Sequence, residues 1–414
     1  MSCTRLRCAG WLLCFLLLAC PSLGLALTPD QSLVLQRARA IAAAPIDDFS
    51  LLGASELQGD AGYRYQLAFL GYSLCSVVQA EPPLRNEGRT LFTRLVEKME
   101  RPKTLAYWKR DGYPGDGLKR DNAMYRGHLN LMYALAHDRF GETRFDEKFH
   151  ALSSELMGEI VSEHPVCCEP DFVFIQCNSV AVLSLWLHDR AFGTSYASAG
   201  KRLLAWARER MPLAGTTLVR DGYRPSTGKS TAQRAGYANA WLITFLSPVP
   251  ELERDVQTMY ADWRRTFVEP SALREGKCEA SDQTLWLEEM LSAGVQATTL
   301  GLFRIVKGAP AGEALSLDEM AASCLVATTF GALAARSQGD ELLQRQLTHT
   351  ITCVDALVAA LEKKLPAEQR VQARTFRSIA LFARTFRGWN EVLGADIGIQ
   401  SSAGPAPRVQ PASR

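Results

Sequence analysis

Two cysteines, a histidine and two acidic side chains lie within residues 128–177 of the sequence. Cys168 and Cys177 are nine residues apart, with Glu169 and Asp171 between them, and His128 precedes this segment. A thiol, a carboxyl group and an imidazole can each exchange a proton near neutral pH when they line a poorly hydrated cavity. This combination of residue types therefore indicates general acid–base chemistry.

His128 lies on the apolar stripe of a helix predicted over residues 121–138. Met124, His128, Leu131 and Leu135 follow one another at i, i+4, i+7 and i+11, so they share one face of the helix. The imidazole is therefore expected to point inward. It is either an ordinary core side chain that bonds one carbonyl or a catalytic group.

Cys168 is predicted to lie in the loop that leads into the next helix. The pair Pro170-Asp171 is typical of a helix start, with Asp171 as the capping residue, and the helix dipole favours a negative charge there. Two interpretations of the cysteines remain open. Either Cys168 and Cys177, or Cys167 and a distant partner, form a structural disulfide, or Cys168 and Cys177 are catalytic thiols. Their spacing is not that of a zinc site, so we expect no metal.

Aromatic side chains recur at helical spacing on both sides of this segment. Tyr65 and Phe69 stand one turn apart, and so do Tyr237 and Trp241. Such stripes are usually part of a core. In a ring of helices they can instead line a central apolar pocket, where aromatic faces stabilise developing positive charge.

The elements that must position these side chains are predicted to be helices almost throughout. Apolar residues recur at i, i+3, i+4 and i+7 among Ala, Leu, Glu and Arg, and no alternating strand of useful length appears. Helices joined by turns rich in Pro and Gly predict a single all-α domain built from helix hairpins. The predicted helices cover residues 60–80, 86–100, 121–138, 144–162, 172–190, 197–210, 232–246, 250–267, 283–305, 317–337, 340–363 and 368–393.

The charge balance excludes whole classes of partner. The chain has 46 Lys and Arg against 44 Asp and Glu. The first 26 residues hold Arg5, Arg7 and no acidic residue, so residues 27–414 carry 44 charges of each sign. A net charge of zero gives no electrostatic reason to bind nucleic acid or an anionic membrane.

The first 26 residues are predicted to be a signal peptide. Arg5 and Arg7 precede an apolar run over residues 11–19, which is too short to span a bilayer comfortably. Cleavage after Ala26 is favoured over lipidation of Cys20, and of these two only lipidation would bring the mature protein into contact with a membrane. An uncleaved anchor is the third possibility, and in every case we expect an exported chain.

The rest of the chain is predicted to form one domain over residues 27–400, followed by a disordered tail over 401–414 that is rich in Ser, Ala, Gly and Pro. Seven cysteines follow the predicted signal. An odd number leaves at least one thiol free or paired outside the chain. The four cysteines outside residues 167–177 lie singly in apolar segments, where a free cysteine behaves as a small hydrophobic residue.

Several motifs around the candidate residues resemble the linalool dehydratase-isomerase family. The nine-residue Cys–Cys spacing matches too, and the similarity runs from about residue 60 to residue 269. The motifs are Met124–Tyr133 (MYRGHLNLMY), Cys168–Asp171 (CEPD), Gln176–Ala181 (QCNSVA), Leu183–Trp186 (LSLW) and Tyr237–Trp241 (YANAW).

This resemblance implies an (α/α)6 barrel, export to the periplasm, no cofactor, and a homo-oligomeric ring in which a neighbour contributes to each active site. It implies removal of water from a tertiary allylic terpene alcohol, such as linalool, to give a diene, with reversible migration of the hydroxyl. The partner would then be a small apolar alcohol. Carried over by position, the acid–base groups are Cys168, Cys177 and His128, and the pocket residues are Tyr65, Met124, Phe174, Gln176, Tyr237 and Trp241.

The chain departs from the family pattern in its N-terminal segment. The family has a catalytic Asp there, followed by a Tyr. Asp48 can supply the Asp, but residues 51–56 contain no Tyr, and the cysteines of the family's structural disulfide are missing. These departures bear on the identity of the substrate more than on the class of reaction.

Two other functions remain open. (α/α)6 barrels often act on polysaccharides as hydrolases, lyases or epimerases, through paired carboxylates and Trp platforms. The second alternative is a non-catalytic protein that uses the same pocket to bind a hydrophobic ligand.

Overall fold

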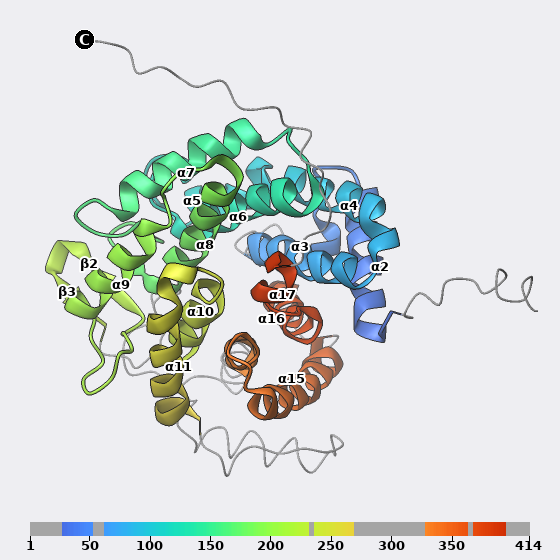
Figure 1. Ribbon diagram of the computed structural model, residues 1–414. Coiled ribbons are helices and arrows are strands. Elements are labelled where there is room, and N and C mark those ends of the chain that lie inside the picture. Colours follow the sequence, from blue (N-terminus) through green and yellow to red (C-terminus); the bar gives the residue numbers. More distant parts are fainter. Residues whose placement is uncertain (1–26, 53–61, 232–235, 269–327, 363–366, 395–414) are drawn as a thin grey trace, which may run out of the picture.

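The helices form a closed ring, as predicted (Figure 1). The computed structural model describes residues 27–52, 62–231, 236–268, 328–362 and 367–394. Successive helices on the inside of the ring contact one another. These inner helices are α3 (Tyr63–Ala80), α6 (Ala123–Phe140), α8 (Ile175–Phe192), α10 (Gly236–Leu246), a helical stretch over residues 328–337, and α16 (Ala367–Thr385).

A second set of helices covers the outside of the ring. The apolar pattern distinguishes the two sets, because an inner helix is buried around its whole circumference and an outer helix on one stripe only. Every residue of α10 is buried, whereas α11 buries the stripe Val256, Met259, Tyr260, Trp263 and Phe267. The outer helices are α2 (Pro29–Ala43), α4 (Arg85–Met99), α7 (Asp146–Ile160), α9 (Ser198–Arg210), α11 (Glu253–Phe267) and α15 (Glu341–Glu362).

The sequence pattern did not predict helix α2. Its start is nevertheless specified locally by a capping box. The Thr28 hydroxyl accepts a hydrogen bond from the Gln31 backbone N–H, and the Gln31 side chain accepts one from the Thr28 N–H. A short helix α5 (Ala106–Arg110) was also not predicted.

The segment predicted as one helix over residues 368–393 is two helices. Helix α16 ends at Thr385, and α17 (Trp389–Gly394) begins after a turn. Gly388 in that turn has φ of +97°, a conformation that residues with a side chain rarely adopt.

Three short strands form an antiparallel sheet in order β1-β2-β3. They are β1 (Val173–Phe174), β2 (Gly222–Arg224) and β3 (Lys229–Ser230). Val173 pairs with Tyr223, and Tyr223 pairs with Ser230. Strands of two or three residues are too short to show alternation in the sequence.

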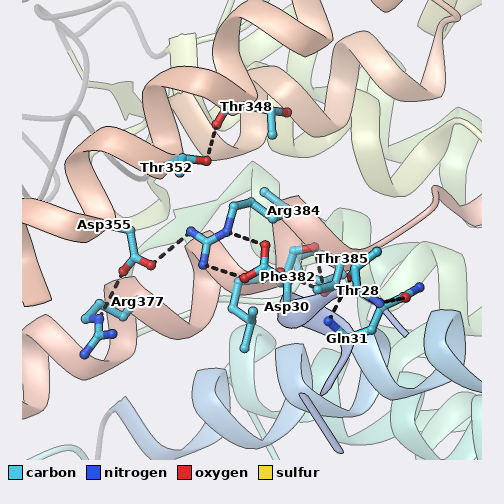
Figure 2. A network of polar contacts seen from close by, with 12 residues as sticks. Thr28, Asp30, Gln31, Thr348, Thr352, Asp355, Arg377, Phe382, Arg384 and Thr385 are labelled. Atoms are coloured by element: carbon cyan, nitrogen blue, oxygen red, sulfur yellow. Dashed lines mark hydrogen bonds and ion pairs between the residues drawn. The ribbon is translucent and has the colours of Figure 1, made fainter. Parts of the chain in front are cut away.

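The first and last parts of the described chain meet, and this contact closes the ring. Figure 2 shows Arg384 of α16 between Asp30 of α2 and Asp355 of α15. The Arg384 side chain contacts Asp30 at 2.9 Å and Asp355 at 3.0 Å, and Arg377 donates to Asp355 at 3.0 Å. Because Arg384 and Asp355 are largely buried, these pairs are less screened by solvent than a surface ion pair.

Several expectations lie outside the described residues: the signal peptide over 1–26, the tail over 401–414 and the helix over 283–305. Within the described residues, no helix is both long and apolar enough to cross a membrane. Cys353 is disulfide-bonded, so the expectation of a free, hydrophobic cysteine is wrong at this position. Cys75 fits that expectation, since it is free and buried.

Candidate active site

The thiols of Cys168 and Cys177 are in direct contact. Their sulfur atoms are 3.0 Å apart, with the Cys177 thiol donating to the Cys168 sulfur. Both cysteines are free and buried. A disulfide would bring the sulfurs to about 2.0 Å. The structure therefore holds two thiols here and not a disulfide between Cys168 and Cys177. Burial, together with the hydrogen bond to Cys168, raises the pKa of Cys177 well above its usual range.

Local hydrogen bonds hold the two cysteines together. Cys177 lies in the first turn of α8, and Cys168 lies in the preceding loop. Asn178 of α8 accepts a hydrogen bond from the Val166 N–H at 3.0 Å and donates one to the Val166 carbonyl at 2.9 Å. The amide side chain therefore fixes the loop before Cys168 alongside the helix that carries Cys177. Asn239 of α10 makes the same pair of bonds to Val219.

Asp171 does not cap a helix, which corrects the sequence-based prediction. Helix α8 begins at Ile175, after strand β1. Asp171 has φ of +60°, and its carboxylate accepts hydrogen bonds from the backbone and hydroxyl of Ser226 at 2.7 and 2.6 Å. It therefore joins the loop that carries Cys168 to the turn after β2.

Helices α6 and α8 approach closely where they carry His128 and Cys177. A Cβ atom on Gly127 would lie 3.2 Å from the backbone nitrogen of Ala181 and 3.4 Å from the carbonyl oxygen of Cys177. A glycine is needed there because any side chain would push the two helix backbones apart. The helices that carry His128 and Cys177 are therefore in tight contact with each other.

His128 is fully buried, as its place on the apolar stripe predicted. Its Nδ1 shares a hydrogen bond of 2.8 Å with the Tyr72 hydroxyl. Its Nε2 is buried and has no hydrogen-bond partner among the described residues. An unpaired buried nitrogen is costly, so a polar ligand atom at Nε2 would be stabilised.

Burial, assisted by the charge of Arg64, lowers the pKa of His128 to about 3. Between pH 6.5 and 3 the unfolded chain therefore binds a proton that the folded protein does not. We expect the free energy of unfolding to fall as the pH drops below 6.5, by up to about 1.4 kcal/mol per pH unit, and this loss to be absent above 6.5. Denaturant titrations at pH 7, 6 and 5 measure it.

The matched variant is His128→Asn, which carries no titrating ring. Its free energy of unfolding should depend less steeply on pH across the same window. Equal pH slopes in the two proteins would contradict the lowered pKa.

Aromatic rings surround His128. Its ring centroid lies 5.9 Å from that of Tyr65, 5.3 Å from Phe69, 6.1 Å from Trp241 and 6.3 Å from Phe245. Most of these pairs meet edge to face, the arrangement that the ring quadrupole favours. The predicted pocket residues Tyr65 and Trp241 therefore come together with the predicted acid–base residue.

The aromatic wall continues into a part of the chain where no site residue was predicted. Phe330 stacks on Trp241 with 3.9 Å between the ring centroids, and the ring centroid of Phe382 of α16 lies 5.0 Å from that of Phe69. The Nε1 of Trp241 is buried without a partner among the described residues. The wall thus combines apolar faces with a buried indole N–H that has no partner among the described residues.

The other predicted pocket residues are buried near the thiols. Gln176, in the first turn of α8, donates to the Tyr237 hydroxyl at 3.1 Å and leaves its Oε1 unpaired among the described residues. Burial raises the pKa of Tyr237 well above its usual range, and the nearby Asp221 adds to this. Met124, one turn before His128, and Phe174, at the start of α8, are both buried.

Arg64 is part of the site, although the sequence analysis did not select it. Its guanidinium lies 4.8 Å from the ring centroid of Tyr65 and 4.5 Å from that of Tyr107. Nε and Nη1 are buried without partners among the described residues. Its charge helps to lower the pKa of His128. The only signal in the sequence is its position, next to Tyr65 at the start of an otherwise apolar helix.

Tyr65 links this arginine to the thiols. Burial raises the pKa of its hydroxyl to about 12, the charge of Arg64 opposes this rise, and the neighbouring Cys177 and Cys168 add to it. Tyr65 therefore keeps its proton at neutral pH. The hydroxyl can serve as a hydrogen-bond donor beside the thiol pair.

Asp48 lies apart from these contacts. Its carboxylate accepts a hydrogen bond from the Ser50 backbone N–H at 2.9 Å, and this bond lowers its pKa. Lys98 binds the backbone carbonyls of Pro45, Ile46 and Asp48 and so holds the segment. The described contacts do not join Asp48 to the thiols, and its catalytic role stays a prediction.

No described group of three or more His, Cys, Asp or Glu side chains is arranged to hold a metal ion. The described side chains of the site offer several chemical groups of their own. These are a thiol pair, a neutral imidazole, phenol and amide groups, and one guanidinium, close to the aromatic rings around His128, which together are named the aromatic chamber.

Two comparisons bear on this site and its fold. The chain is similar to an inactive variant of an alpha-1,6-mannanase of Salegentibacter sp. HEL1_6, solved in complex with alpha-1,6-mannotetrose. The TM-score is 0.50 at 9% identity, with 86% of this chain and 98% of that chain covered. A likeness this distant shows the fold alone, and it confirms the (α/α)6 barrel. Residues 64–354, which carry the thiols, His128 and most of the aromatic wall, match the family model described as linalool dehydratase/isomerase. This chain belongs to the linalool dehydratase/isomerase family.

Proposed function

We propose that this protein is a cofactor-independent dehydratase of small tertiary allylic alcohols, with hydroxyl migration as a second activity. The observation that carries the proposal is the pair of free, touching thiols next to a helix contact whose other helix carries a neutral histidine surrounded by aromatic rings. Membership of a dehydratase/isomerase family supports the same class of reaction. Linalool-, geraniol- and myrcene-like compounds are the proposed substrates and products.

The chamber supplies an acid where the reaction needs one. Cys177 keeps its proton because burial raises its pKa. In the proposed reaction the thiol pair gives a proton to the substrate hydroxyl, the carbon–oxygen bond breaks, and water leaves. The Nε2 of His128 and the Tyr65 hydroxyl are the polar groups that can hold the hydroxyl beforehand. Both are placed next to the aromatic wall.

The aromatic wall can stabilise the positive charge of the proposed intermediate. Loss of water leaves an allyl-cation-like carbon skeleton, and the faces of Trp241, Tyr65 and Phe69 attract positive charge. A methyl proton then returns to the thiol pair as the diene forms. The thiol pair thereby regains its proton, and the alcohol has been converted to a diene and water. Re-addition of water at the other end of the allyl system gives the isomeric alcohol.

Gas-phase product analysis tests this proposal directly. Purified protein is incubated without oxygen with a panel of tertiary alkenols, and dienes and rearranged alcohols are measured. Diene formation from at least one tertiary allylic alcohol is the expected result. Protein that binds such alcohols but turns none over is the non-catalytic alternative. The glycan-active alternative has no observation at the thiol pair in its favour.

Oxidation should switch the enzyme off. Diamide takes two hydrogens from a thiol pair and leaves a disulfide, and the two sulfurs need to move by only about 1 Å. We expect loss of dehydration by more than about 90% and recovery with dithiothreitol, because the disulfide has no proton to give. Activity is measured alongside the mass of the peptides that carry Cys168 and Cys177.

A dithiothreitol-only sample controls for reduction of the disulfide at Cys353. Full activity of protein whose Cys168 and Cys177 are shown by mass to be disulfide-linked would overturn the assigned role of the thiols.

We further propose that the protein is exported to the periplasm and works as a homo-oligomeric ring. The positively charged start, the apolar run and the small residues before Leu27 support export. The family resemblance supports the ring, in which a neighbour would bring a further group such as Asp48. The mass of the mature chain and its size in solution test these two points.

A further inference from the structure

A cavity lies between α2, α3 and α16, and neither thiol lines it. Its volume is about 460 Å³, within the range of small-molecule sites. Gln66, Leu70 and Ser73 of α3 line it. These positions follow one residue after Tyr65, Phe69 and Tyr72, so they face about 100° around the helix from the aromatic chamber. The same helix therefore packs against the aromatic rings around His128 on one side and lines this cavity on the next.

Positive charge dominates the polar side of this cavity. Arg37, Arg374 and Arg377 line it, against a single carboxylate, Glu362. Glu362 is already bonded by Arg374 at 2.7 Å and by Arg377 at 2.8 Å. It therefore has little capacity left to neutralise a third guanidinium.

Arg37 is that third guanidinium. It makes no hydrogen bond or ion pair with any residue that the structure describes, and it is half-buried. Burial, followed by the charge of Arg377, lowers its pKa. A half-buried guanidinium beside another one is unfavourable on its own. An anion in the cavity would satisfy its donors.

Apolar side chains make up six of the ten uncharged lining residues, and the other four are three serines and a glutamine. Ile41 of α2, Leu52, Leu70 of α3 and Leu381 of α16 contribute the hydrocarbon surface, and Leu51, which is 51% exposed, lies at the rim. A bare inorganic ion would leave this surface in contact with water. The lining therefore matches a ligand with one charged end and a hydrocarbon body.

We propose that this cavity binds a small amphipathic carboxylate, with its head group on Arg37 and its hydrocarbon chain against the leucine side chains. A carboxylate fits a guanidinium with two parallel hydrogen bonds. A doubly charged phosphate fits less well, because Glu362 lines the same cavity and Asp355 lies near Arg37. The site is independent of the reaction at the thiols.

Occupancy of the cavity would also tighten the closure of the ring. Arg37 belongs to α2, and Leu381 belongs to α16, the pair of helices that Asp30 and Arg384 already join. A ligand that bridges the two helices binds the folded protein alone and raises its melting temperature as its concentration rises.

Calorimetric titration of the full chain with octanoate tests the proposal, with 1-octanol, acetate and inorganic phosphate as comparisons. We expect octanoate to bind more tightly than all three. Arg37→Gln should weaken octanoate binding about tenfold or more, as expected for loss of a charge-assisted pair. The matched control is Arg39→Gln on the same helix, whose guanidinium pairs with Glu87 at the surface. This control should bind octanoate like the unaltered protein.

Leu51→Asp provides a second variant that should fold normally, since this side chain is exposed. It puts a negative charge at the rim and should also weaken octanoate binding. Equal octanoate affinity of the unaltered protein and Arg37→Gln overturns the proposal, because octanoate then binds elsewhere, such as in the aromatic chamber. If acetate or phosphate binds as tightly as octanoate, the assigned contact between the hydrocarbon chain and the leucine side chains is wrong. If 1-octanol binds as tightly as octanoate, the assigned contact between the carboxylate and Arg37 is wrong.

Discussion

Replacing Cys177 with alanine is expected to lower kcat for dehydration by about 10²–10⁴-fold, the usual loss when an acid–base group is removed. The variant lacks the thiol that donates to Cys168 at 3.0 Å and whose raised pKa keeps a proton available at neutral pH. The aromatic chamber keeps its shape, because the change removes one sulfur atom. KM should therefore change by much less than kcat. Initial rates of diene formation without oxygen measure both.

Cys75→Ala is the matched control for this variant. Cys75 is also free and buried, so its replacement leaves a cavity of the same size, but it has no contact with the thiol pair among the described interactions. It should lose stability to a similar degree and keep its activity. Undiminished turnover by Cys177→Ala would show that the thiol pair is not the source of the proton.

Replacing Trp389 with alanine is expected to lower the free energy of unfolding by about 3–5 kcal/mol, as for other buried Trp residues. Trp389 of α17 is 1% exposed, and its ring lies 4.6 Å from Phe386, 5.3 Å from Tyr72 and 5.6 Å from Phe245. The large gap left behind borders two residues that contact His128. We therefore expect a loss of activity that exceeds the fraction of protein unfolded.

Trp389→Phe is the control, because a smaller ring still fills most of the space and should cost about half as much or less. Denaturant titration gives the stability, and the rate per folded molecule gives the effect on the site. A loss below about 1 kcal/mol would mean that α17 does not support the core in this way.

The folded unit extends beyond the residues that match the family model. The match ends at residue 354, yet Trp389 and Phe382 lie beyond it and pack behind Tyr72 and Phe69. A chain cut at the end of the match would lack the helices that close the ring. Residues outside the match are thus needed for the site inside it.

Local pattern was enough to predict the inward position of His128. The stripe from Met124 to Leu135 repeats with helical period, and α6 agrees with the helix predicted over residues 121–138 within two residues at each end. The pattern was not enough for Asp171, because a capping residue and a residue in a loop with positive φ have the same sequence preference. Only the contact with Ser226, 55 residues away, distinguishes them.

Long-range contacts account for what the sequence could not show. The spacing of Cys168 and Cys177 left a disulfide and a pair of thiols equally open, and the choice depends on a distance of 1 Å. Tyr72 bonds His128 across 56 residues. Arg64 enters the site because α3 and the loop before α8 pack together, which no local period encodes.

The contact between Asp30 and Arg384 has a consequence for the order of events in folding. The two residues are 354 positions apart, so this bond forms only after most of the chain has been synthesised and loops of this length have closed. The aromatic wall depends on the same late pairing, since Phe69 of an early helix rests on Phe382 of a late one. An unfinished chain thus holds both thiols and His128 but lacks the completed wall. Activity is expected to appear with closure of the ring rather than with formation of its first helices.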